Sequence, residues 1–258
     1  MTSDNSDQPA SRRLAQELRQ QIVDGTLQPG AQVPSERVLA AEHGVARNTA
    51  REAIRLLADE GLVTARHGKG AFVRERPRLM RFGSERYSHR LREETGLSPY
   101  RAEVIRQGRT PRVDCTSIER VSPPSDVAER LGLNEATDTV VRRENWYYAD
   151  SDPIQVGITY IPWEIVKDSV LATHANTGKG SIYGRFEDLG YPITRIREEV
   201  SARMPTPDEA KRLAIPYGVP VIEVLHTGID DKGRRFEVTR FIMRADFNGL
   251  DYNMPVED

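Results

Sequence analysis

The stretch Gly44-Val45-Ala46-Arg47-Asn48-Thr49-Ala50-Arg51-Glu52-Ala53 decides the fold of the first quarter of this chain. From residue 46 to residue 60 the apolar residues fall on one helix face, and Gly61 follows in the place where helices commonly end. We therefore predict a helix over residues 46–60. Its opposite face carries Arg47, Arg51 and Arg55.

Two patterns upstream predict the partners of this helix. Leu14, Leu18 and Ile22 recur every four residues and predict a helix from Ser11 to Asp24. A short second helix opens at Pro34-Ser35-Glu36-Arg37, where Ser35 is suited to cap the first turn, and it breaks at His43-Gly44-Val45. Two helices joined by a tight turn with glycine form a helix-turn-helix, whose second helix enters the major groove of DNA.

The residues after this helix predict a wing. Segments 62–66 and 71–74 flank His67-Gly68-Lys69-Gly70 and indicate a β-hairpin with a glycine-rich tip. Glycine lets the backbone approach a sugar-phosphate chain, while His67 and Lys69 offer donors. On the recognition helix, an arginine fork can bond both major-groove acceptors of guanine or grip phosphate, while Asn48 suits adenine and Thr49 a phosphate.

Composition limits the other possibilities. The chain has 258 residues, a net charge of −2 and one cysteine, Cys115. Its length favours two domains, and no apolar run is long enough to cross a membrane. The polar, acidic start does not resemble a signal peptide, so we expect a cytoplasmic protein with a disordered tail at residues 1–10. A lone cysteine excludes an internal disulfide and a thiolate metal cluster.

The net charge and the local charge pattern give opposite indications about DNA binding. The net charge of −2 offers no global attraction to nucleic acid. Residues 66–81 nevertheless form a basic stretch, which is equally well explained as a solvated face. Its charges are Arg66, Lys69, Arg74, Arg76, Arg78 and Arg81 against Glu75 alone.

The second part of the chain contains an internal repeat. Val121 to Tyr160 and Met204 to Arg244 share one order, a Pro-containing turn, a short helix, a strand, a turn and a returning strand. The helices are expected at residues 126–131 and 208–213, and the strands at 140–148, 154–161, 219–226 and 236–243. Two helix-plus-hairpin units predict one antiparallel sheet with helices on a face, which makes the chain an α+β protein.

The domain boundaries follow from these patterns. We place the DNA-binding domain at residues 11–74 and the second domain at 91–250. Residues 75–90 are charged and without periodicity, so we assign them to a linker, and residues 251–258 to a tail.

The N-terminal motifs resemble the GntR family of winged helix-turn-helix regulators. Besides the stretch 44–53, the matching residues are Asp24-Gly25-Thr26-Leu27-Gln28-Pro29-Gly30, Pro34-Ser35-Glu36-Arg37, Glu60-Gly61-Leu62-Val63 and Gly68-Lys69-Gly70. The resemblance implies base or phosphate contact by Arg37, Arg47, Asn48, Thr49 and Arg51, and it implies that His67 and Gly68 reach the minor groove. Ala46 departs from the family, which usually has Ser or Thr there, so another group must cap the helix or its start is weaker by about 1 kcal/mol.

The second domain resembles the UTRA ligand-sensing domain of the HutC subfamily, whose fold is similar to chorismate lyase. The resemblance covers Leu91 to Asn248 and rests on four short motifs. They are Tyr100-Arg101-Ala102-Glu103-Val104, Leu131-Gly132-Leu133, Tyr160-Ile161-Pro162 and Arg244-Ala245-Asp246. It implies that the domain also dimerises, and that its pocket opens between the sheet and the loop that follows the linker.

Strand alternation suggests which residues line that pocket. Val141, Arg143, Asn145 and Tyr147 share one face of the first long strand of the repeat. Relatives that bind phosphorylated amino sugars carry arginine where Asn145 and Tyr147 stand, which argues against a phosphorylated ligand, whereas Arg143 supplies a cation. We therefore expect an uncharged or carboxylate metabolite. Ser88, Ser181, Tyr183 and Glu237 also match pocket positions of the family, although Glu237 is equally well explained as the solvated charge of a strand.

Motifs of catalysis and metal binding are missing from the sequence. Thr177-Gly178-Lys179-Gly180-Ser181 lacks the spacing of a P-loop, and the histidines show no metal-ligand spacing. There is no nucleophile elbow, and the acids of Glu198-Glu199 and Asp230-Asp231 are expected to be solvated. We expect no metal, no cofactor and no enzyme.

Together these patterns predict a dimeric one-component transcription regulator. The leading hypothesis is a repressor whose recognition helices and wings engage a near-palindromic double-stranded operator, and which a small-molecule effector releases. Two other classes stay open. One is a DNA-binding regulator without an effector, and the other is an enzyme, since the second domain is similar to a lyase.

Overall fold

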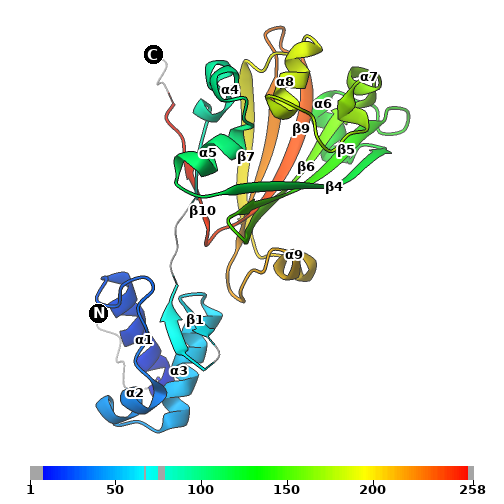
Figure 1. Ribbon diagram of the computed structural model, residues 1–258. Coiled ribbons are helices and arrows are strands. Elements are labelled where there is room, and N and C mark those ends of the chain that lie inside the picture. Colours follow the sequence, from blue (N-terminus) through cyan, green and yellow to red (C-terminus); the bar gives the residue numbers. More distant parts are fainter. Residues whose placement is uncertain (1–7, 67, 75–78, 255–258) are drawn as a thin grey trace. The chain divides into compact units, whose positions relative to one another are not determined.

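The computed structural model describes residues 8–66, 68–74 and 79–254. The chain forms two compact units (Figure 1). The first unit combines Met1–Pro77 with Met204–Val219, and the second combines Arg78–Arg203 with Pro220–Asp258. Most of the predicted tail at residues 1–10 lies outside the described residues, and a helix already begins at Ala10.

Three helices build the core of the first unit. They are α1 (Ala10–Val23), α2 (Glu36–Glu42) and α3 (Arg47–Asp59), which confirms the predicted helices with slightly different ends. Ser35 caps α2 as expected, because its hydroxyl accepts the backbone N–H of Val38 at 3.4 Å. Ala46 gives α3 no side-chain cap. The buried core residues are Leu14, Ala15, Leu18, Val33, Leu39, Ala50, Ala53, Leu57, Val63, Ala71 and Val73.

The wing is a two-stranded antiparallel hairpin. Its strands β1 (Val63–Arg66) and β2 (Gly70–Val73) pair from Val63 opposite Val73 to Arg66 opposite Gly70. The hairpin is attached to the core by Val63, Ala71 and Val73, whose side chains are buried. The alternate positions of both strands therefore face outward.

The segment Met204–Val219 contains α9 (Pro207–Arg212), the second helix of the predicted repeat. Its start is fixed by a capping box, in which the Thr206 hydroxyl accepts the N–H of Glu209 at 3.3 Å and the Glu209 carboxylate accepts the N–H of Thr206 at 2.8 Å. The sequence predicts this helix, but it places residues 204–219 in the second domain, whereas the structure groups them with the first unit.

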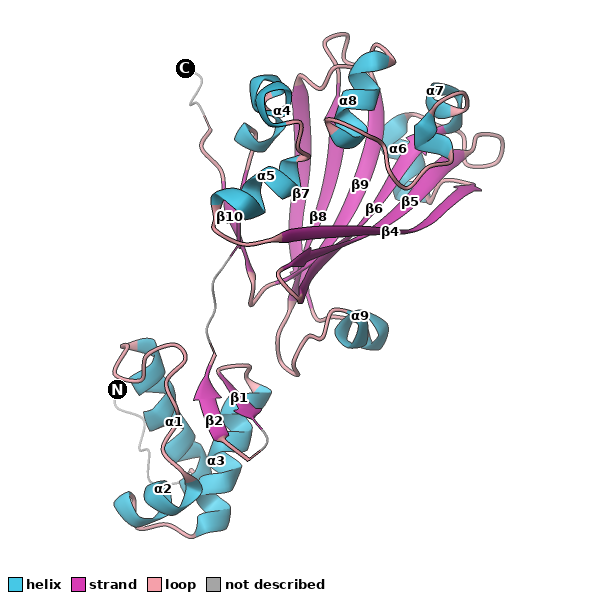
Figure 2. Cartoon of the chain, viewed as in Figure 1, coloured by secondary structure: helices cyan, strands magenta, loops and turns pink. Residues whose placement is uncertain are grey.

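A six-stranded sheet forms the body of the second unit (Figure 2). The strands are β4 (Pro111–Val121), β5 (Val140–Ala149), β6 (Asp152–Pro162), β7 (Arg195–Arg203), β8 (Val221–Ile229) and β9 (Arg235–Arg244). They lie in the order β4-β5-β6-β9-β8-β7, and all neighbours are antiparallel. The two predicted hairpins, β5-β6 and β8-β9, are confirmed, and β4 and β7 are outer strands beyond the predicted repeat.

The register of this sheet aligns five polar residues across five strands. Arg143 of β5 lies opposite Thr159 of β6, which lies opposite Thr239 of β9. Thr239 in turn lies opposite His226 of β8, and His226 lies opposite Glu198 of β7. Residues directly opposite one another share a face of the sheet. We call this set the polar row.

Short helices cover the sheet. They are η2 (Glu85–Tyr87), α4 (His89–Thr95), α5 (Pro99–Arg106), α6 (Ser125–Leu131), α7 (Trp163–Val166), η3 (Val170–Ala172) and α8 (Ser181–Asp188). Phe186 of α8 packs with Val141 and Ile161 on the face that carries the polar row. Val127 of α6 packs with Val140 and Tyr160, whose side chains alternate to the opposite face.

The structure corrects the predicted linker and tail. Residues 79–90 are not a free linker, because β3 (Leu79–Phe82) pairs in parallel with β10 (Asn248–Asp251) and is followed directly by η2 and α4. Residues 251–258 do not begin as a free tail either, since Asp251 ends β10 and the hydroxyl of Tyr252 donates to Glu198 at 2.6 Å. Both segments lack periodicity because a four-residue strand is too short to show it.

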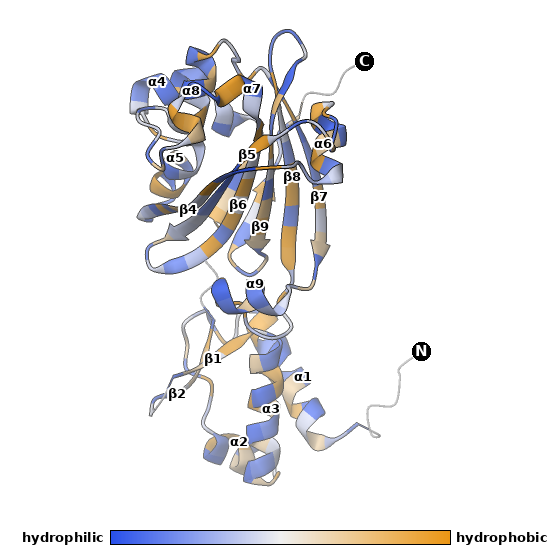
Figure 3. Ribbon diagram, turned by 90° about the vertical axis from the view of Figure 1, so that its right-hand side faces the viewer, coloured by the Kyte–Doolittle hydropathy of each residue, from blue (hydrophilic) through white to orange (hydrophobic). Residues whose placement is uncertain are grey.

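Hydropathy agrees with this layout. Figure 3 shows hydrophilic and hydrophobic positions together on α3, as expected of a helix that buries one face. Among the described residues no helix is both long and apolar enough to cross a membrane.

Candidate DNA interface and candidate ligand pocket

The exposed face of α3 carries the residues expected to contact DNA. Arg47 and Asn48, in its first turn, are exposed, and Thr49 is half-buried. Within the described part of the chain the Arg47 guanidinium makes no hydrogen bond or ion pair. Arg37 of α2 is exposed as well. These side chains can therefore reach a ligand outside the protein without breaking an internal bond.

Arg51 is exposed but already paired. Its guanidinium holds the Glu36 carboxylate with two hydrogen bonds of 2.9 Å, which joins α3 to the first residue of α2. This hydrogen bond and the charge of Arg51 hold the pKa of Glu36 below its ordinary value. Phosphate or guanine must therefore compete with Glu36 for Arg51. Arg55 is paired in the same way with Glu52 and Asp59.

The wing tip is held by a residue that the sequence did not indicate. Gln32 donates from its side-chain amide to the carbonyl of Lys69 at 2.8 Å. The backbone of Gln32 also forms an isolated antiparallel β-bridge with Phe72 of β2. Gly68 and Lys69 are exposed, and Gly68 adopts a left-handed φ of +72° with open space around its Cα. His67 lies outside the described residues. The guanidinium of Arg66 stacks over the Phe72 ring at 4.6 Å.

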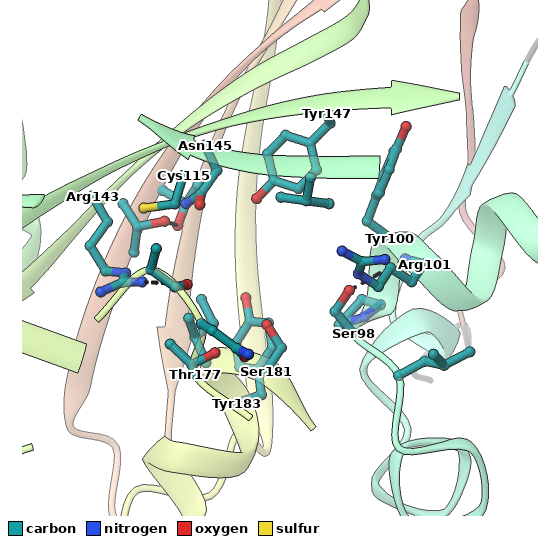
Figure 4. A pocket seen from close by; sticks show the side chains of 18 of the residues that line it. Ser98, Tyr100, Arg101, Cys115, Arg143, Asn145, Tyr147, Thr177, Ser181 and Tyr183 are labelled. Atoms are coloured by element: carbon teal, nitrogen blue, oxygen red, sulfur yellow. Dashed lines mark hydrogen bonds between the residues drawn. The ribbon is translucent and has the colours of Figure 1, made fainter. Parts of the chain in front are cut away.

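The second unit contains a cavity of about 560 Å³ over the face of the sheet that carries the polar row. Its floor comes from β4, β5, β6 and β9, and its walls from residues 96–101 before and within α5 and residues 175–183 before and within α8. Figure 4 shows these three groups of side chains around the cavity. The volume suits a small metabolite.

Most residues expected in the pocket line this cavity. They are Arg143, Asn145, Tyr147, Ser181 and Tyr183. Ser88 does not line it, and its hydroxyl accepts the N–H of Leu91 at 3.4 Å, where it caps α4. Glu237 is fully buried behind the wall, where its carboxylate accepts the hydroxyls of Tyr183 at 3.0 Å and Thr239 at 2.6 Å. Its reading as a solvated strand charge is therefore wrong.

The Arg143 guanidinium binds backbone carbonyls rather than a carboxylate. It is 1% exposed, and its guanidinium donates to the carbonyls of Leu171 at 2.6 Å and His174 at 2.9 Å. Among the described residues no carboxylate pairs with it, and its Nε is buried without a partner. Burial lowers the pKa of Arg143 from its ordinary value. Arg143 therefore fixes the segment 171–175 next to the cavity and leaves one donor unused.

The cavity wall is cationic. Arg86, Arg101 and Arg143 line it, and no Asp or Glu is among its described lining residues. Arg86 is compensated from behind by Glu103, whose carboxylate lies 3.1 Å from its guanidinium. The wall as a whole thus favours a ligand with an anionic group over a cationic one.

Aromatic hydroxyls supply further donors. The rings of Tyr100 and Tyr147 meet edge to face at 4.9 Å, and both line the cavity. Burial raises the pKa of Tyr147 to about 12, so its hydroxyl stays neutral and can donate. The hydroxyl of Tyr100 is buried without a hydrogen-bond partner among the described groups. A buried donor of this kind is costly unless a ligand or water satisfies it.

The sequence missed several lining residues. Tyr100, Cys115, Thr159, Thr177 and Thr239 all line the cavity. Thr159 and Thr239 share a hydrogen bond of 2.9 Å at the centre of the polar row. Alternation along β6 and β9 would have placed them on one face, but only the register shows that this face is the one that Arg143 occupies.

A buried cluster of charges lies next to the cavity. His226 is 0% exposed, and its two ring nitrogens lie 3.0 Å from carboxylate oxygens, Nδ1 from Glu198 and Nε2 from Glu237. Burial disfavours the charged ring, but the charge of Glu237 and the hydrogen bonds to both acids raise the pKa of His226. Because each ring nitrogen needs a proton to donate, the geometry fits an imidazolium between two carboxylates.

Glu198 is buried, so the expectation that both acids of Glu198-Glu199 are solvated is wrong. Its side chain is 4% exposed and also binds the guanidinium of Arg81 from β3. Burial acts against its ionisation, but the hydrogen bond to His226 and the charge of Arg81 hold the pKa of Glu198 well below its ordinary value. Glu199 points to the other face, is exposed and pairs with Arg130. The two acids differ because neighbours on a strand face opposite sides of the sheet.

The two acids of Asp230-Asp231 also differ in exposure. Asp230 is 3% exposed, and its carboxylate accepts the backbone N–H of Lys232 at 3.0 Å and of Arg234 at 2.7 Å, so it closes the β8-β9 turn. Asp231 is exposed. In the described ranges no group of three or more His, Cys, Asp or Glu side chains is arranged to hold a metal ion.

Comparison with known proteins agrees with this arrangement. Residues 10–73 match the model of bacterial regulatory proteins of the gntR family, and residues 106–247 match the UTRA domain. The chain is 26% identical over 239 residues to the HTH-type transcriptional repressor NagR of Bacillus subtilis, with 92% of this chain and 91% of NagR covered. An uncharacterised HTH-type transcriptional regulator of Streptomyces coelicolor is 30% identical over 257 residues, with 95% of each chain covered.

Solved structures show the same fold. A crystal structure of a GntR-family transcriptional regulator superposes with a TM-score of 0.64 at 26% identity and covers 97% of this chain and 99% of its own. PhnF from Mycobacterium smegmatis superposes with a TM-score of 0.60 at 21% identity, with 95% of this chain and all of PhnF covered.

Proposed function

Because the chain belongs to the GntR family of bacterial regulatory proteins and carries the UTRA domain typical of the HutC subfamily, we propose that it is a repressor released from its operator by a small molecule. It is a DNA-binding transcription regulator and not an enzyme, since NagR and the Streptomyces coelicolor relative are both transcription regulators. The lyase-like alternative is thereby set aside. A regulator that acts on operator DNA works in the bacterial cytoplasm.

One observation carries the DNA-binding half of the proposal. The exposed first turn of α3 presents Arg47 and Asn48, whose side chains make no hydrogen bond or ion pair within the described residues, beside a wing whose glycine tip is exposed. A helix of this kind reads base edges in the major groove while the wing contacts the adjacent backbone.

Selection of duplexes from a random pool by the full chain tests this role. A specific motif should emerge, and Arg47→Ala should weaken binding to the selected duplex by about 1–3 kcal/mol, the usual value of a bidentate base contact. Arg55→Ala is the matched control, because Arg55 lies on the same helix but is held by Glu52 and Asp59. If no duplex is preferred over random sequence, or if Arg47→Ala binds as tightly as the wild type, base readout by α3 is wrong.

The effector half of the proposal rests on the cationic cavity. Its arginines and tyrosine hydroxyls suit a small metabolite with a carboxylate, and the absence of arginine at Asn145 and Tyr147 argues against a phosphorylated sugar. The name of NagR identifies a repressor, which supports repression rather than activation by this chain.

Cys115 provides a direct assay of occupancy. It is the one cysteine of the sequence and lines the cavity, so a bound metabolite should slow its alkylation by iodoacetamide. A metabolite panel scored by this protection and by thermal shift should give hits that also release the selected duplex. A panel without any protecting compound would favour the alternative of a regulator without an effector.

Dimerisation completes the proposal. We propose a homodimer whose two recognition helices match half-sites about one helical turn apart, so the selected motif should be a near-palindrome. Light scattering of the full chain measures the oligomeric state. A monomer at micromolar concentration, or a motif without two-fold symmetry, would contradict it.

A further inference from the structure

We propose that the buried cluster of Glu198, His226 and Glu237 couples the cavity to the β3-β10 strand pair, so that occupancy of the cavity changes how firmly these two strands are held. The inference rests on the proposed function, because it treats the cavity as the effector site. It adds a route by which that site acts on another part of the fold.

The cluster touches the cavity wall directly. Glu237 accepts the hydroxyls of Tyr183 at 3.0 Å and Thr239 at 2.6 Å, and both of these residues line the cavity. Thr239 continues the contact to Thr159 on the cavity floor at 2.9 Å. A ligand that displaces or engages either hydroxyl therefore changes the hydrogen bonding of a fully buried carboxylate.

The other end of the cluster touches the strand pair. Glu198 binds the guanidinium of Arg81, a residue of β3, and accepts the hydroxyl of Tyr252, the residue after β10, at 2.6 Å. Arg81 also stacks over the ring of Phe241 at 4.7 Å, and Phe241 lines the cavity. In the chain, β3 is the first element after the winged helix-turn-helix.

His226 links the two ends. With one nitrogen 3.0 Å from Glu198 and the other 3.0 Å from Glu237, the imidazolium has one arrangement that satisfies both acids. Tyr87, which lines the cavity, places its hydroxyl 3.3 Å from Nδ1 and 3.1 Å from the guanidinium of Arg81. A shift at one end leaves a buried charge or donor unsatisfied at the other, and that penalty is what transmits the signal.

The arrangement is also balanced in charge. The side chains of Arg81 and His226 contribute two positive charges, and Glu198 and Glu237 two negative ones, all within a region where each of these side chains is at most 4% exposed. A network needed only for stability does not have to end on a ligand cavity at one side and on β3 and β10 at the other. The coupling role and the purely structural role make different predictions.

The experiment perturbs the cavity without an effector. Cys115 of the full chain is alkylated with iodoacetamide, which places an adduct on the cavity floor, and amide hydrogen exchange is measured for residues 79–82 and 248–251. In the wild type we expect exchange in these segments to speed up by about fivefold or more, the lower end of the usual range for coupled sites. In His226→Gln the adduct should change exchange in these segments less than in the wild type.

Thr227→Val is the matched control. Thr227 is the next residue on β8, is 2% exposed and lies on the opposite face of the sheet, so this variant should respond to alkylation as the wild type does. Tyr252→Phe keeps the histidine and both acids and should weaken the response in residues 248–251. It replaces His226→Gln in the comparison if that variant does not fold.

Two results would overturn the proposal. In the first, exchange in β3 and β10 of the wild type does not respond to alkylation. In the second, exchange responds in His226→Gln and in Tyr252→Phe as strongly as in the wild type. Neither result depends on finding an effector, so a failed metabolite panel and a failed coupling experiment are separate outcomes.

Discussion

Glu198→Gln should strongly destabilise the second unit while hardly changing the shape of the side chain. Glu198 binds Arg81, lies 3.0 Å from Nδ1 of His226 and accepts the hydroxyl of Tyr252 at 2.6 Å, and its side chain is 4% exposed. The amide keeps the size of the side chain but removes the charge that compensates two buried cations. Removing one partner of a buried ion pair typically costs about 3–5 kcal/mol.

The adjacent acid provides the control. Glu199 is exposed on the opposite face of β7 and pairs with Arg130 and Arg197, so Glu199→Gln removes the same charge one residue away in solvent. We expect its unfolding midpoint to match that of the wild type, because exposed pairs are screened by water.

Tryptophan fluorescence can measure the difference in this unit alone. Both tryptophans of the chain, Trp146 in β5 and Trp163 in α7, belong to the second unit. For a unit of this size about 1 kcal/mol corresponds to about 2–4 °C in Tm, so Glu198→Gln should lower Tm by about 6–20 °C. If the free energies of unfolding of the two variants differ by less than about 1 kcal/mol, the cluster is not the ion-paired core that its geometry indicates.

The pKa of His226 is raised in the folded state, so its stabilisation should be fully present below its unfolded pKa and be lost as pH rises through the folded pKa. The pKa of Glu198 is lowered, so its stabilisation should be present above its unfolded pKa and be lost as pH falls through the folded pKa. Urea titrations from about pH 5 to about pH 9 should show the alkaline loss of stability in the wild type and not in His226→Gln. Gln32→Ala removes the bond to the Lys69 carbonyl and should weaken binding to the selected duplex while α1 to α3 melt normally, and equal affinity would show that this bond does not position the wing. Arg143→Lys keeps the charge but lacks the fork that reaches the carbonyls of Leu171 and His174, so limited proteolysis within 171–177 should become faster, and an unchanged rate would contradict the anchoring role. Gly157→Ala places a methyl group 3.0 Å from carbons of both Tyr147 and Phe241, so it should cost about 1–3 kcal/mol by overpacking, and an unchanged urea midpoint would show that these walls can yield.

The DNA-binding half could be read from the sequence because its determinants are local. Helix periodicity, the Ser35 cap and the glycine-tipped hairpin each involve residues close together in the chain, and each was confirmed in place. Two of the side-chain contacts there are not local in this sense. The pairing of Arg51 with Glu36 and the contact of Gln32 with the wing join residues that no short pattern relates.

The second unit shows the same limit more strongly. The helix-plus-hairpin repeat predicted the inner strands and α6 and α9, because each unit is a continuous segment. Alternation along β5 selected Arg143, Asn145 and Tyr147 together, and these residues share the cavity. The same reasoning treated Glu198 and Glu237 as candidates for solvated charges, since a strand pattern gives the face of a residue but not what covers that face.

By itself, then, the sequence determined the two kinds of domain, the α+β class and the residues presented on one helix and one strand, because those features depend on neighbours within a few positions. Only the tertiary structure decided that Arg143, Thr159, Thr239, His226 and Glu198 form one row, and that Arg81 and Tyr252 close its far end. Their meeting depends on the pairing order β5-β6-β9-β8-β7 and on β3 lying beside β10. Strand pairing across long stretches of chain is set by the burial of whole faces, which no single segment records.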